Sequence, residues 1–211
     1  MLSKEGFDLW ADGYDQAVGL SDDDNTYPFA GYREVLGRIF QTVMEKKNAA
    51  VLDLGFGTGT LTARLYENGC SVYGQDFSPR MIELASAKMP GAQLYLGDLT
   101  EGPAEPLRKR TYDFIIATYS LHHLTDEQKL TLLRTLRGML KEDGRILIGD
   151  VAFETREALK RYRREAGDEW DDEEIYIVAD ELRKSFPEVS FTQVSFCAGI
   201  MTLPRRSSSE E

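Results

Sequence analysis

The segment that most constrains the fold is a short apolar run followed by three alternating glycines. Residues 49–54 are apolar except for one aspartate, which is typical of a strand buried on both faces. Gly55, Gly57 and Gly59 follow, and residues 60–66 then place leucines at helical spacing. Glycines permit positive φ and a close approach of ligand to backbone, and the first turn of a helix offers unpaired N–H groups. This order of strand, glycine turn and helix predicts the opening unit of a nucleotide-binding α/β fold.

The spacing of the glycines narrows the class of ligand. It is G-x-G-x-G, which differs from the G-x-G-x-x-G of dinucleotide-binding enzymes. Position 60 is Thr, so the turn lacks the third glycine where a pyrophosphate site has it. Taken alone, the pattern also suits a glycine-rich turn in another kind of α/β protein.

Strands and helices continue to alternate after this unit. Repeated strand–helix units of this length predict a parallel sheet with helices on both faces. Ser78 and Pro79 suit the N-cap and first turn of one helix, and residues 100–110 are expected to form a proline-containing loop. The predicted strands are residues 49–54, 71–75, 92–96, 112–118 and 145–149, and the predicted helices are residues 60–68, 78–88 and 126–140.

The two ends of the chain add further elements. A helix is predicted at 29–46, and polar helices are predicted at 154–165 and 172–185. Strands at 189–196 and 199–203 must form an antiparallel hairpin, because their link is too short for a parallel crossover. The predicted organisation is a single domain at 1–204, made of a helical cap at 1–47, a ligand-binding core at 48–150, helices at 151–188 and a hairpin at 189–204, with a disordered tail at 205–211.

The charge balance argues against a nucleic-acid ligand. The 211 residues carry 36 acidic and 25 basic side chains, a formal net charge of −11, and a negative field repels phosphate backbones. The basic clusters at 108–110 and 160–164 are interpreted as solvated faces. The two cysteines make no disulfide framework, and neither a membrane-spanning apolar run nor a signal peptide is found. We therefore expect a cytoplasmic protein that binds neither nucleic acid nor membrane.

Three predicted strands end in aspartates: Asp53, Asp76 and Asp98. In open parallel sheets, ligands bind beyond the carboxyl ends of the strands. Asp76 lies 21 positions after Gly55, which suits a carboxylate that accepts both hydroxyls of a ribose. Asp98, with Leu99, suits the exocyclic amine of an adenine. Three carboxylates around a glycine turn favour a ligand with a ribose and positive charge, as in S-adenosylmethionine, which has an ammonium and a sulfonium but no phosphate.

Each of these side chains also has a purely structural interpretation. Asp76 and Asp98 could shape turns, whereas Asp53 lies in an apolar strand, where a buried carboxylate needs a partner. His122 and His123 could act as a general base or orient a substrate, but they could equally cap a helix or anchor a loop. We predict no metal site, because the chain has no other histidine and no ligand spacing accompanies the pair.

Five segments, in order along the chain, resemble motifs of the class I S-adenosylmethionine-dependent methyltransferases. They are V-L-D-L-G-F-G-T-G at 51–59, V-Y-G-Q-D-F-S-P-R-M at 72–81, G-D-L at 97–99, Y-D-F-I-I-A-T-Y-S-L-H-H-L at 112–124 and L-K-E-D-G-R-I-L-I at 140–148. Together with W-A-D-G-Y-D-Q at 10–16, they are most similar to small bacterial methyltransferases of undefined substrate. The resemblance implies a three-layer Rossmann-like α/β sandwich with a seven-stranded, mostly parallel sheet whose last strand is antiparallel.

The resemblance also implies which residues bind the cofactor. Asp53 and the glycine turn would hold the methionyl part, Asp76 the ribose, and Asp98 with Leu99 the adenine. An aromatic side chain of the N-terminal segment would cover the bound cofactor. The full implied set is Tyr14, Asp53, Gly55, Phe56, Gly57, Thr58, Gly59, Asp76, Phe77, Asp98, Leu99, Thr118, Tyr119 and Ser120.

For this family the expected reaction is in-line displacement of a methyl group from S-adenosylmethionine, with S-adenosylhomocysteine as product. The candidate bases are His122, His123 and Tyr119, needed only if the acceptor must lose a proton. No Asn/Asp-Pro-Pro-aromatic motif follows the fourth strand, and neither cysteine follows a proline, so a small-molecule acceptor is expected. A non-catalytic cofactor sensor and an RNA or protein methyltransferase remain the alternatives, and either a monomer or a homodimer is expected.

Overall fold

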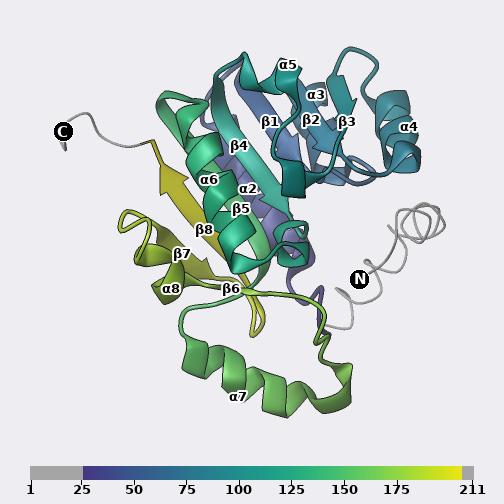
Figure 1. Cartoon of the computed structure of the whole chain (residues 1–211). Helices are drawn as coiled ribbons and strands as arrows, with labels where there is room; N and C mark the ends of the chain where they lie inside the picture. The colour runs from purple at the N-terminus through teal and green to yellow at the C-terminus, as the bar shows by residue number, and fades with distance from the viewer. Residues whose placement is uncertain (1–25, 206–211) are drawn as a thin grey trace.

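The computed structural model describes residues 26–205 as a central sheet with helices on both faces (Figure 1). The sheet has the order β3-β2-β1-β4-β5-β8-β7, and a short strand, β6, pairs with the end of β5. The strands are β1 (Ala50–Leu54), β2 (Ser71–Asp76), β3 (Gln93–Leu96), β4 (Tyr112–Thr118), β5 (Leu140–Phe153), β6 (Ile177–Val178), β7 (Ser190–Gln193) and β8 (Ala198–Pro204).

The direction of the strands confirms the predicted topology. Strands β3, β2, β1, β4 and β5 pair in parallel, whereas β8 is antiparallel to both β5 and β7. The last strand of the chain is therefore the reversed one, and it is inserted between β5 and β7. A direct hairpin connection between β7 and β8 leaves no other arrangement, because successive strands with a short link can pair only in opposite directions.

Two apolar cores explain the three layers. Successive side chains of a strand point to opposite faces, so Val51 of β1 joins one core and Leu52 joins the other. The first core contains side chains of α2 (Tyr32–Met44), α3 (Thr60–Glu67) and α4 (Pro79–Lys88). The second contains side chains of α5 (Glu105–Arg108), α6 (Asp126–Gly138) and α8 (Ala179–Arg183). Helix α7 (Arg156–Ala166) follows β5 and contributes Leu159 to the first core. None of the helices between residues 26 and 205 has both the length and the apolar character of a membrane span.

Several predicted elements are wrong or incomplete. The helix expected at 172–185 is instead an irregular segment followed by β6 and by α8, which has only five residues. Residues 176–178 are aromatic or β-branched and buried, and such residues favour a strand over an amphipathic helix. The expected loop at 100–110 contains α5 and most of a 3-10 turn, η1 (Leu99–Glu101). Strand β5 starts at Leu140, five residues before its predicted start.

Glycine at position 149 brings helix α2 directly onto the sheet. A Cβ at Gly149 would lie 2.3 Å from Val35 Cγ1 and 2.9 Å from Ile39 Cδ1, so only a glycine allows α2 to pack this closely on β5. Residues 28 and 29, just before α2, and Tyr32, its first residue, lie beside the carboxyl ends of β1 and β4. There the rings of Phe29 and Tyr32 contact the ring of Tyr119, with centroid distances of 5.4 and 5.1 Å.

Gln75 is a polar residue near the end of β2, and it is fully buried. Its Oε1 accepts a hydrogen bond from the backbone N–H of Ala104 at 2.6 Å, and its Nε2 donates to the carbonyl of Gly102 at 3.1 Å. The side chain thus holds the loop after η1 against the sheet. This supplies the reason for a glutamine at the end of β2.

We expect Gln75→Ala to lower the free energy of unfolding by ~1–3 kcal/mol, because it leaves a backbone donor and acceptor without partners. Urea denaturation followed by circular dichroism measures the effect. Gln93→Ala, a substitution of an exposed glutamine on β3, is the control and should change stability by less than ~0.5 kcal/mol. Equal losses in the two variants would contradict the anchoring role of Gln75.

Candidate active site

A cavity of about 430 Å³ opens at the carboxyl ends of β1, β2 and β4, as the parallel topology requires. Most of the residues that the sequence nominated line it. Gly59 is an exception, since a Cβ there would instead meet Met89 and Ala85 around helix α4. Tyr14 lies outside the described residues. The nominated residues that line the cavity are Asp53, Gly55, Phe56, Gly57, Thr58, Asp76, Phe77, Asp98, Leu99, Thr118, Tyr119, Ser120, His122 and His123.

The glycine turn is held tightly against the end of β4. Gly55 has φ +73°, and a Cβ at this position would lie 2.4 Å from the Cβ of Ser120. The Ser120 hydroxyl donates a hydrogen bond to the carbonyl of Leu54 at 2.8 Å. Both the positive φ and the close approach require glycine here. Glycine thus allows the ends of β1 and β4 to meet and form one wall of the cavity.

Asp53 is a buried carboxylate whose two oxygens differ in their hydrogen bonding. The hydroxyl of Thr62 donates to Oδ2, whereas Oδ1 has no hydrogen-bond partner among the described residues. Burial, with a smaller contribution from the charge of Asp76, raises the pKa of Asp53 from 3.8 to about 7. A buried anion of this kind is costly unless a cation or donor pairs with it. Asp53 also lines the cavity, so its carboxylate lies where a ligand would bind.

Asp76 and Asp98 both shape turns and face the cavity. Asp76 accepts the N–H of Gly57 at 2.9 Å and the N–H of Ser78 at 3.0 Å, so it ties the glycine turn to the end of β2. Asp98 accepts the N–H of Thr100 at 2.8 Å and caps η1. The structural interpretation of these residues is therefore correct, but it does not exclude ligand binding. An ionised carboxylate has about four acceptor sites, and these backbone bonds use only some of them.

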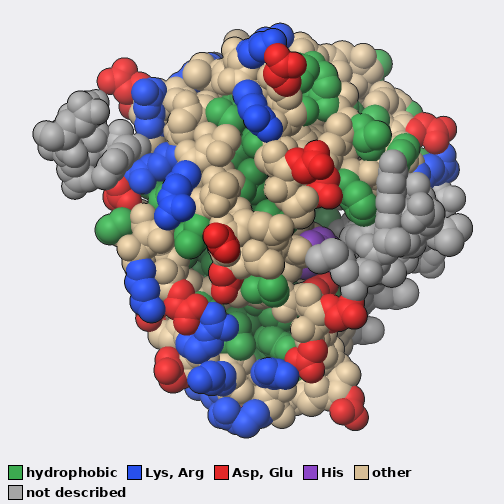
Figure 2. All heavy atoms as spheres, in the orientation of Figure 1, with side chains coloured by type: hydrophobic (Ala, Val, Ile, Leu, Met, Phe, Trp, Pro, Cys, Tyr) green, Lys and Arg blue, Asp and Glu red, His purple; other side chains and the backbone are tan. Residues whose placement is uncertain are grey.

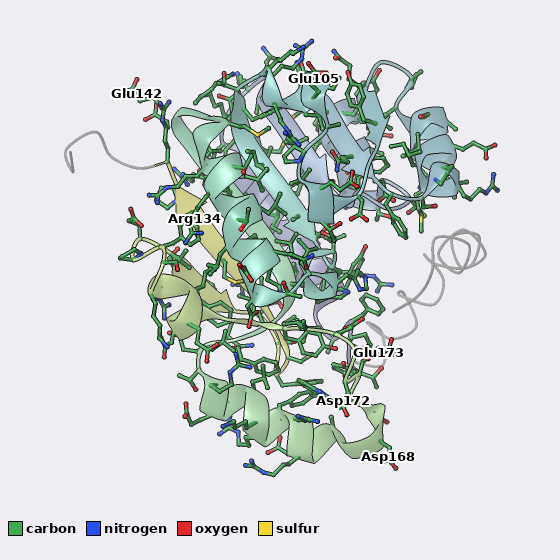
Figure 3. All side chains as sticks on the ribbon, in the orientation of Figure 1. Glu105, Arg134, Glu142, Asp168, Asp172 and Glu173 are labelled. Carbon is green, nitrogen blue, oxygen red and sulfur yellow. The ribbon has the colours of Figure 1, made fainter. Side chains whose placement is uncertain are left out.

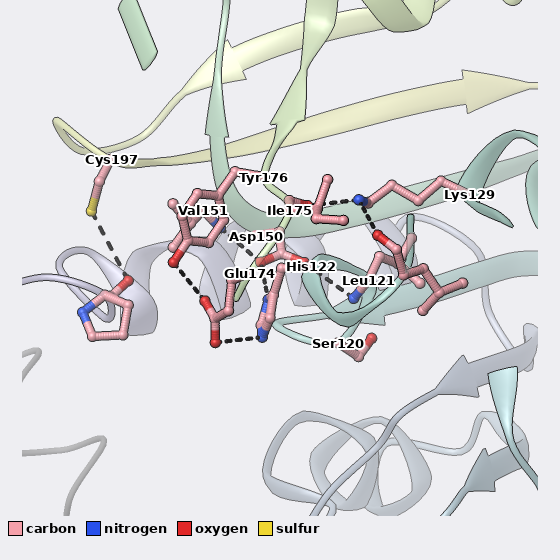
Figure 4. A network of polar contacts seen from close by, with 12 residues as sticks. Ser120, Leu121, His122, Lys129, Asp150, Val151, Glu174, Ile175, Tyr176 and Cys197 are labelled. Carbon is pink, nitrogen blue, oxygen red and sulfur yellow. Dashed lines mark hydrogen bonds and ion pairs between the residues drawn. The ribbon is translucent and has the colours of Figure 1, made fainter. Parts of the chain in front are cut away.

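His122 lies at the other end of the cavity, in a 3-10 turn, η2 (Leu121–His123), that follows β4. Its Nδ1 is 2.7 Å from Oδ1 of the fully buried Asp150, which lies in β5 one residue past the last pairing with β4. Its Nε2 is 3.5 Å from Oε1 of Glu174. Figure 4 shows the His122 ring between these two carboxylates. Because a carboxylate accepts at Nδ1, that nitrogen carries a proton, and Nε2 faces Glu174 and the cavity.

The two neighbouring histidines differ in their tendency to accept a proton. Burial opposes the charged form of His122, but the carboxylate of Asp150, followed by Glu174, outweighs burial and raises its pKa. Burial and the neighbouring charge of His122 lower the pKa of His123 to about 4, so His123 is neutral near pH 7. The rings are 4.1 Å apart between centroids, in an edge-to-face arrangement.

A buried lysine that the sequence did not single out fixes this end of the cavity. Lys129 of α6 donates to the carbonyls of Leu124 and Ile175, each at 2.6 Å (Figure 4). The N–H of Ile175 in turn donates to the carbonyl of His122 at 2.8 Å. These bonds join η2 to the segment before β6. They hold Glu174 beside the histidines although it is far from them in the sequence.

Asp150 and Glu174 are the functional candidates that sequence reasoning missed. Asp150 lies one residue past the predicted end of its strand, and β5 continues to Phe153, so the search for strand-end aspartates did not find it. Glu174 lies in an acidic run at 171–174, and nothing in the sequence distinguishes it from its neighbours. The hydroxyl of Tyr176 donates a hydrogen bond to Oε2 of Glu174 at 2.6 Å.

Comparisons with known proteins identify the family and the fold of the chain. Residues 51–144 match a family model described as a methyltransferase domain. Over 194 residues the chain is 37% identical to an "uncharacterized methyltransferase" of Geobacillus sp. (strain WCH70), with 88% of each chain covered.

Solved structures show the same fold at low identity. The chain superposes on magnesium protoporphyrin IX methyltransferase from Synechocystis PCC 6803 with bound S-adenosylhomocysteine, with a TM-score of 0.66 and 19% identity over 84% of this chain and 85% of that one. For the DhpI–S-adenosylhomocysteine complex the TM-score is 0.70, with 18% identity over 96% of each chain. The sequence relationship and the shared architecture together show that this chain belongs to the methyltransferase family and has the Rossmann-like fold of S-adenosylmethionine-dependent methyltransferases.

Proposed function

We propose that this protein binds S-adenosylmethionine in the cavity and transfers its methyl group to a small-molecule acceptor. The observation that carries the proposal is Oδ1 of Asp53, which has no hydrogen-bond partner among residues 26–205, in a cavity wall to which these residues contribute no lysine or arginine. A buried anion without basic neighbours suits an ammonium group and repels phosphates. Solved structures of the same fold contain S-adenosylmethionine or S-adenosylhomocysteine, which supports the same assignment here.

The cavity offers a partner for each part of the cofactor. The ammonium would pair with Asp53, and the methionyl chain would pass over the glycine turn, where Gly57 leaves open space. Asp76 would accept the ribose hydroxyls, and Phe77 with Leu99 would contact the adenine. This orientation points the sulfonium toward Tyr119 and His122. The acceptor then lies between the aromatic rings of Phe29, Tyr32 and Tyr119 and the polar end of the cavity.

The reaction would be an in-line displacement. A lone pair of the acceptor forms the new bond to the methyl carbon, while the carbon–sulfur bond breaks and its electron pair remains on the sulfur of S-adenosylhomocysteine. The protein contributes mainly position, which is worth ~7–11 kcal/mol for well-oriented reactants. Of the three nominated bases, His122 has the most suitable surroundings. Asp150 orients its ring and Nε2 faces the cavity, whereas Tyr119 packs between two other rings.

A nucleic-acid substrate fits the surface less well. Figure 2 shows basic side chains gathered over α7, at the bottom of the view, but acidic side chains are interspersed among them. Two of these basic residues already pair with carboxylates: Arg156 with Glu181 and Arg163 with Asp172. The cavity is also of the size that suits small ligands. A small acceptor is therefore the better-supported substrate class.

Calorimetric titration with S-adenosylmethionine, S-adenosylhomocysteine and NAD tests the cofactor assignment. We expect saturable binding of the first two and none of NAD. Asp76→Ala should weaken cofactor binding by ~1–3 kcal/mol, because it removes acceptors of the ribose hydroxyls. Asp143→Ala, at an exposed position outside the cavity, is the control. Absent cofactor binding, or equal affinities of the two variants, would contradict the assignment.

A second measurement separates an enzyme from a cofactor sensor. Methyl-labelled S-adenosylmethionine is incubated with panels of thiols, amines, carboxylates and phenols, and with RNA and protein. Label transfer to a small molecule is the expected outcome. Cofactor binding without transfer to any class would support the sensor, and transfer only to RNA or protein would contradict the small-molecule acceptor.

A further inference from the structure

Three potential metal ligands come together at the polar end of the cavity. One ligand atom from each of His122, His123 and Glu174 lies within 4.8 Å of the other two. All three side chains line the cavity, beside the place where the acceptor would lie. His122 is buried, whereas His123 and Glu174 are partly exposed. The sequence alone indicated no metal site, because Glu174 is separated from the histidine pair by α6, β5 and α7.

The contacts behind these three residues resemble those of metal-binding sites. Asp150 accepts from His122 Nδ1 at 2.7 Å, which fixes the tautomer that leaves Nε2 able to bind an ion. Tyr176 donates to Glu174 Oε2 at 2.6 Å and leaves Oε1 toward the histidine (Figure 4). Carboxylates behind ligating histidines, and hydrogen bonds to ligating carboxylates, are regular features of metal centres. His122 and Glu174 are therefore already oriented to bind an ion.

The separation of His122 Nε2 and Glu174 Oε1 is longer than a usual hydrogen bond and leaves room for a shared ion. It is 3.5 Å, whereas N–H···O hydrogen bonds cluster near ~2.9 Å. Two ligands of a tetrahedral ion, each about 2.0–2.2 Å from it, are about 3.4 Å apart. The separation of this pair is therefore close to that of two ligands on one tetrahedral ion.

From this geometry we propose that His122, His123 and Glu174 bind one divalent transition-metal ion of the zinc type, with an open position toward the acceptor. Two imidazoles and one carboxylate are a donor set that suits zinc and its neighbours in the first transition series. Three protein ligands with one free position distinguish a catalytic site from a closed structural one. Three-ligand coordination also uses both histidines, which the simple general-base interpretation does not.

The ion would act on the acceptor, and this part of the inference rests on the proposed function. A thiol or hydroxyl of the acceptor binds the open position and releases its proton to solvent, because a bound cation lowers its pKa. The lone pair that remains forms the bond to the methyl carbon, and the carbon–sulfur bond of the cofactor breaks toward sulfur. The step needs no external oxidant or reductant. The ion thereby replaces a protein base.

Ion binding is tested without any methyl transfer. The full chain is treated with a chelator, dialysed and titrated with Co²⁺, whose visible absorption reports its coordination, and Zn²⁺ is then added as competitor. We expect one tightly bound Co²⁺ per chain, displaced by one equivalent of Zn²⁺. Glu174→Gln keeps an acceptor for Tyr176 but removes the anionic ligand, and it should lower Co²⁺ affinity at least about 100-fold. His123→Ala should do the same.

Glu173→Gln is the matched control, one residue away at an exposed position on the loop that leads from η3 (Gly167–Glu169) to β6 (Figure 3). It should bind Co²⁺ as the wild type does. Circular dichroism verifies that each variant is folded. The inference is overturned if the wild type binds less than one equivalent, or if Glu174→Gln binds as tightly as Glu173→Gln. Transfer that proceeds unchanged in chelated enzyme overturns the activating role of the ion. Failure of the proposed function would show separately, as absent cofactor binding in calorimetry.

Discussion

Asp53→Asn is expected to remove tight binding of the cofactor and at the same time stabilise the ligand-free protein above pH 7. The carbonyl oxygen of asparagine can still accept a hydrogen bond from the Thr62 hydroxyl. Its NH2 group then takes the place of Oδ1, which has no partner among the described residues. An ammonium group that met a carboxylate then meets N–H groups. Loss of one member of a buried charge pair costs ~2–5 kcal/mol, so the Kd for S-adenosylmethionine should rise on the order of 100-fold.

The stability effect has the opposite sign because Asp53 is a carboxylate with a raised pKa. Its folded-state pKa of about 7 exceeds the ordinary value of 3.8, so the native state binds the proton more tightly than the unfolded state does. The stability due to the neutral form is present below pH ~4, falls as pH rises through ~4–7 and is absent above. The difference between the two pKa values corresponds to about 4 kcal/mol in the free energy of unfolding. Asp53→Asn removes this pH dependence.

Urea denaturation of ligand-free protein between pH 5 and pH 8, together with calorimetry at pH 8, measures both effects. Asp113→Asn is the matched control, because Asp113 is also a buried strand aspartate but pairs with Lys46 and Lys141 at 2.6 and 2.7 Å. These lysines outweigh burial and lower its pKa, so Asp113→Asn should destabilise the protein at pH 8. A destabilised Asp53→Asn protein that still binds cofactor normally would refute the role of Asp53.

The second large effect is expected from Gly55→Ala. The added Cβ would lie 2.4 Å from the Cβ of Ser120, and Ser120 is itself fixed by its hydrogen bond to Leu54. A non-glycine residue in the left-handed region costs ~1–2 kcal/mol, and overpacking adds ~1–3 kcal/mol. We expect a loss of ~2–5 kcal/mol in the free energy of unfolding. The cofactor should also bind weakly, because the turn must move out of the wall of the cavity.

Gly57→Ala separates strain from close approach. Gly57 also has positive φ, +55°, but a Cβ there has no heavy atom within 4 Å. It should therefore lose only the ~1–2 kcal/mol of backbone strain. Urea denaturation of both variants gives the comparison. Equal losses at the two positions would mean that the contact with Ser120 has no energetic consequence.

Local features of the sequence explain why part of the molecule was predictable. The apolar run at 49–54 and the glycines after it predict β1 and the turn, because burial on both faces and positive φ leave few alternatives. The parallel arrangement then places the ends of β1, β2 and β3 at one edge of the sheet, so Asp53, Asp76 and Asp98 were expected to share a cavity, and all three line it. The short link between β7 and β8 made the reversed last strand unavoidable.

Other features depend on contacts between distant segments. Residues 172–185 carry polar side chains at spacings that suit a helix. Ile177 and Val178 instead pair with β5 and, like Tyr176, are buried in the two apolar cores, which favours a strand. Tertiary packing overrides local propensity in such short segments. The same segment brings Glu174 to the histidine pair.

By itself, the sequence determined the strand-to-helix unit, the parallel direction of the first five strands and the acidic strand ends. Each depends on residues close in the chain and on the geometry of strands. Only the tertiary structure decided which oxygen of Asp53 lacks a partner, that Asp150 orients His122, and that Lys129 holds the loop bearing Glu174 within 3.5 Å of that imidazole. Those facts arise from hydrogen bonds between β5, α6 and the segment before β6. No local pattern encodes them, since each partner has many equivalent residues nearby and only the packed fold selects among them.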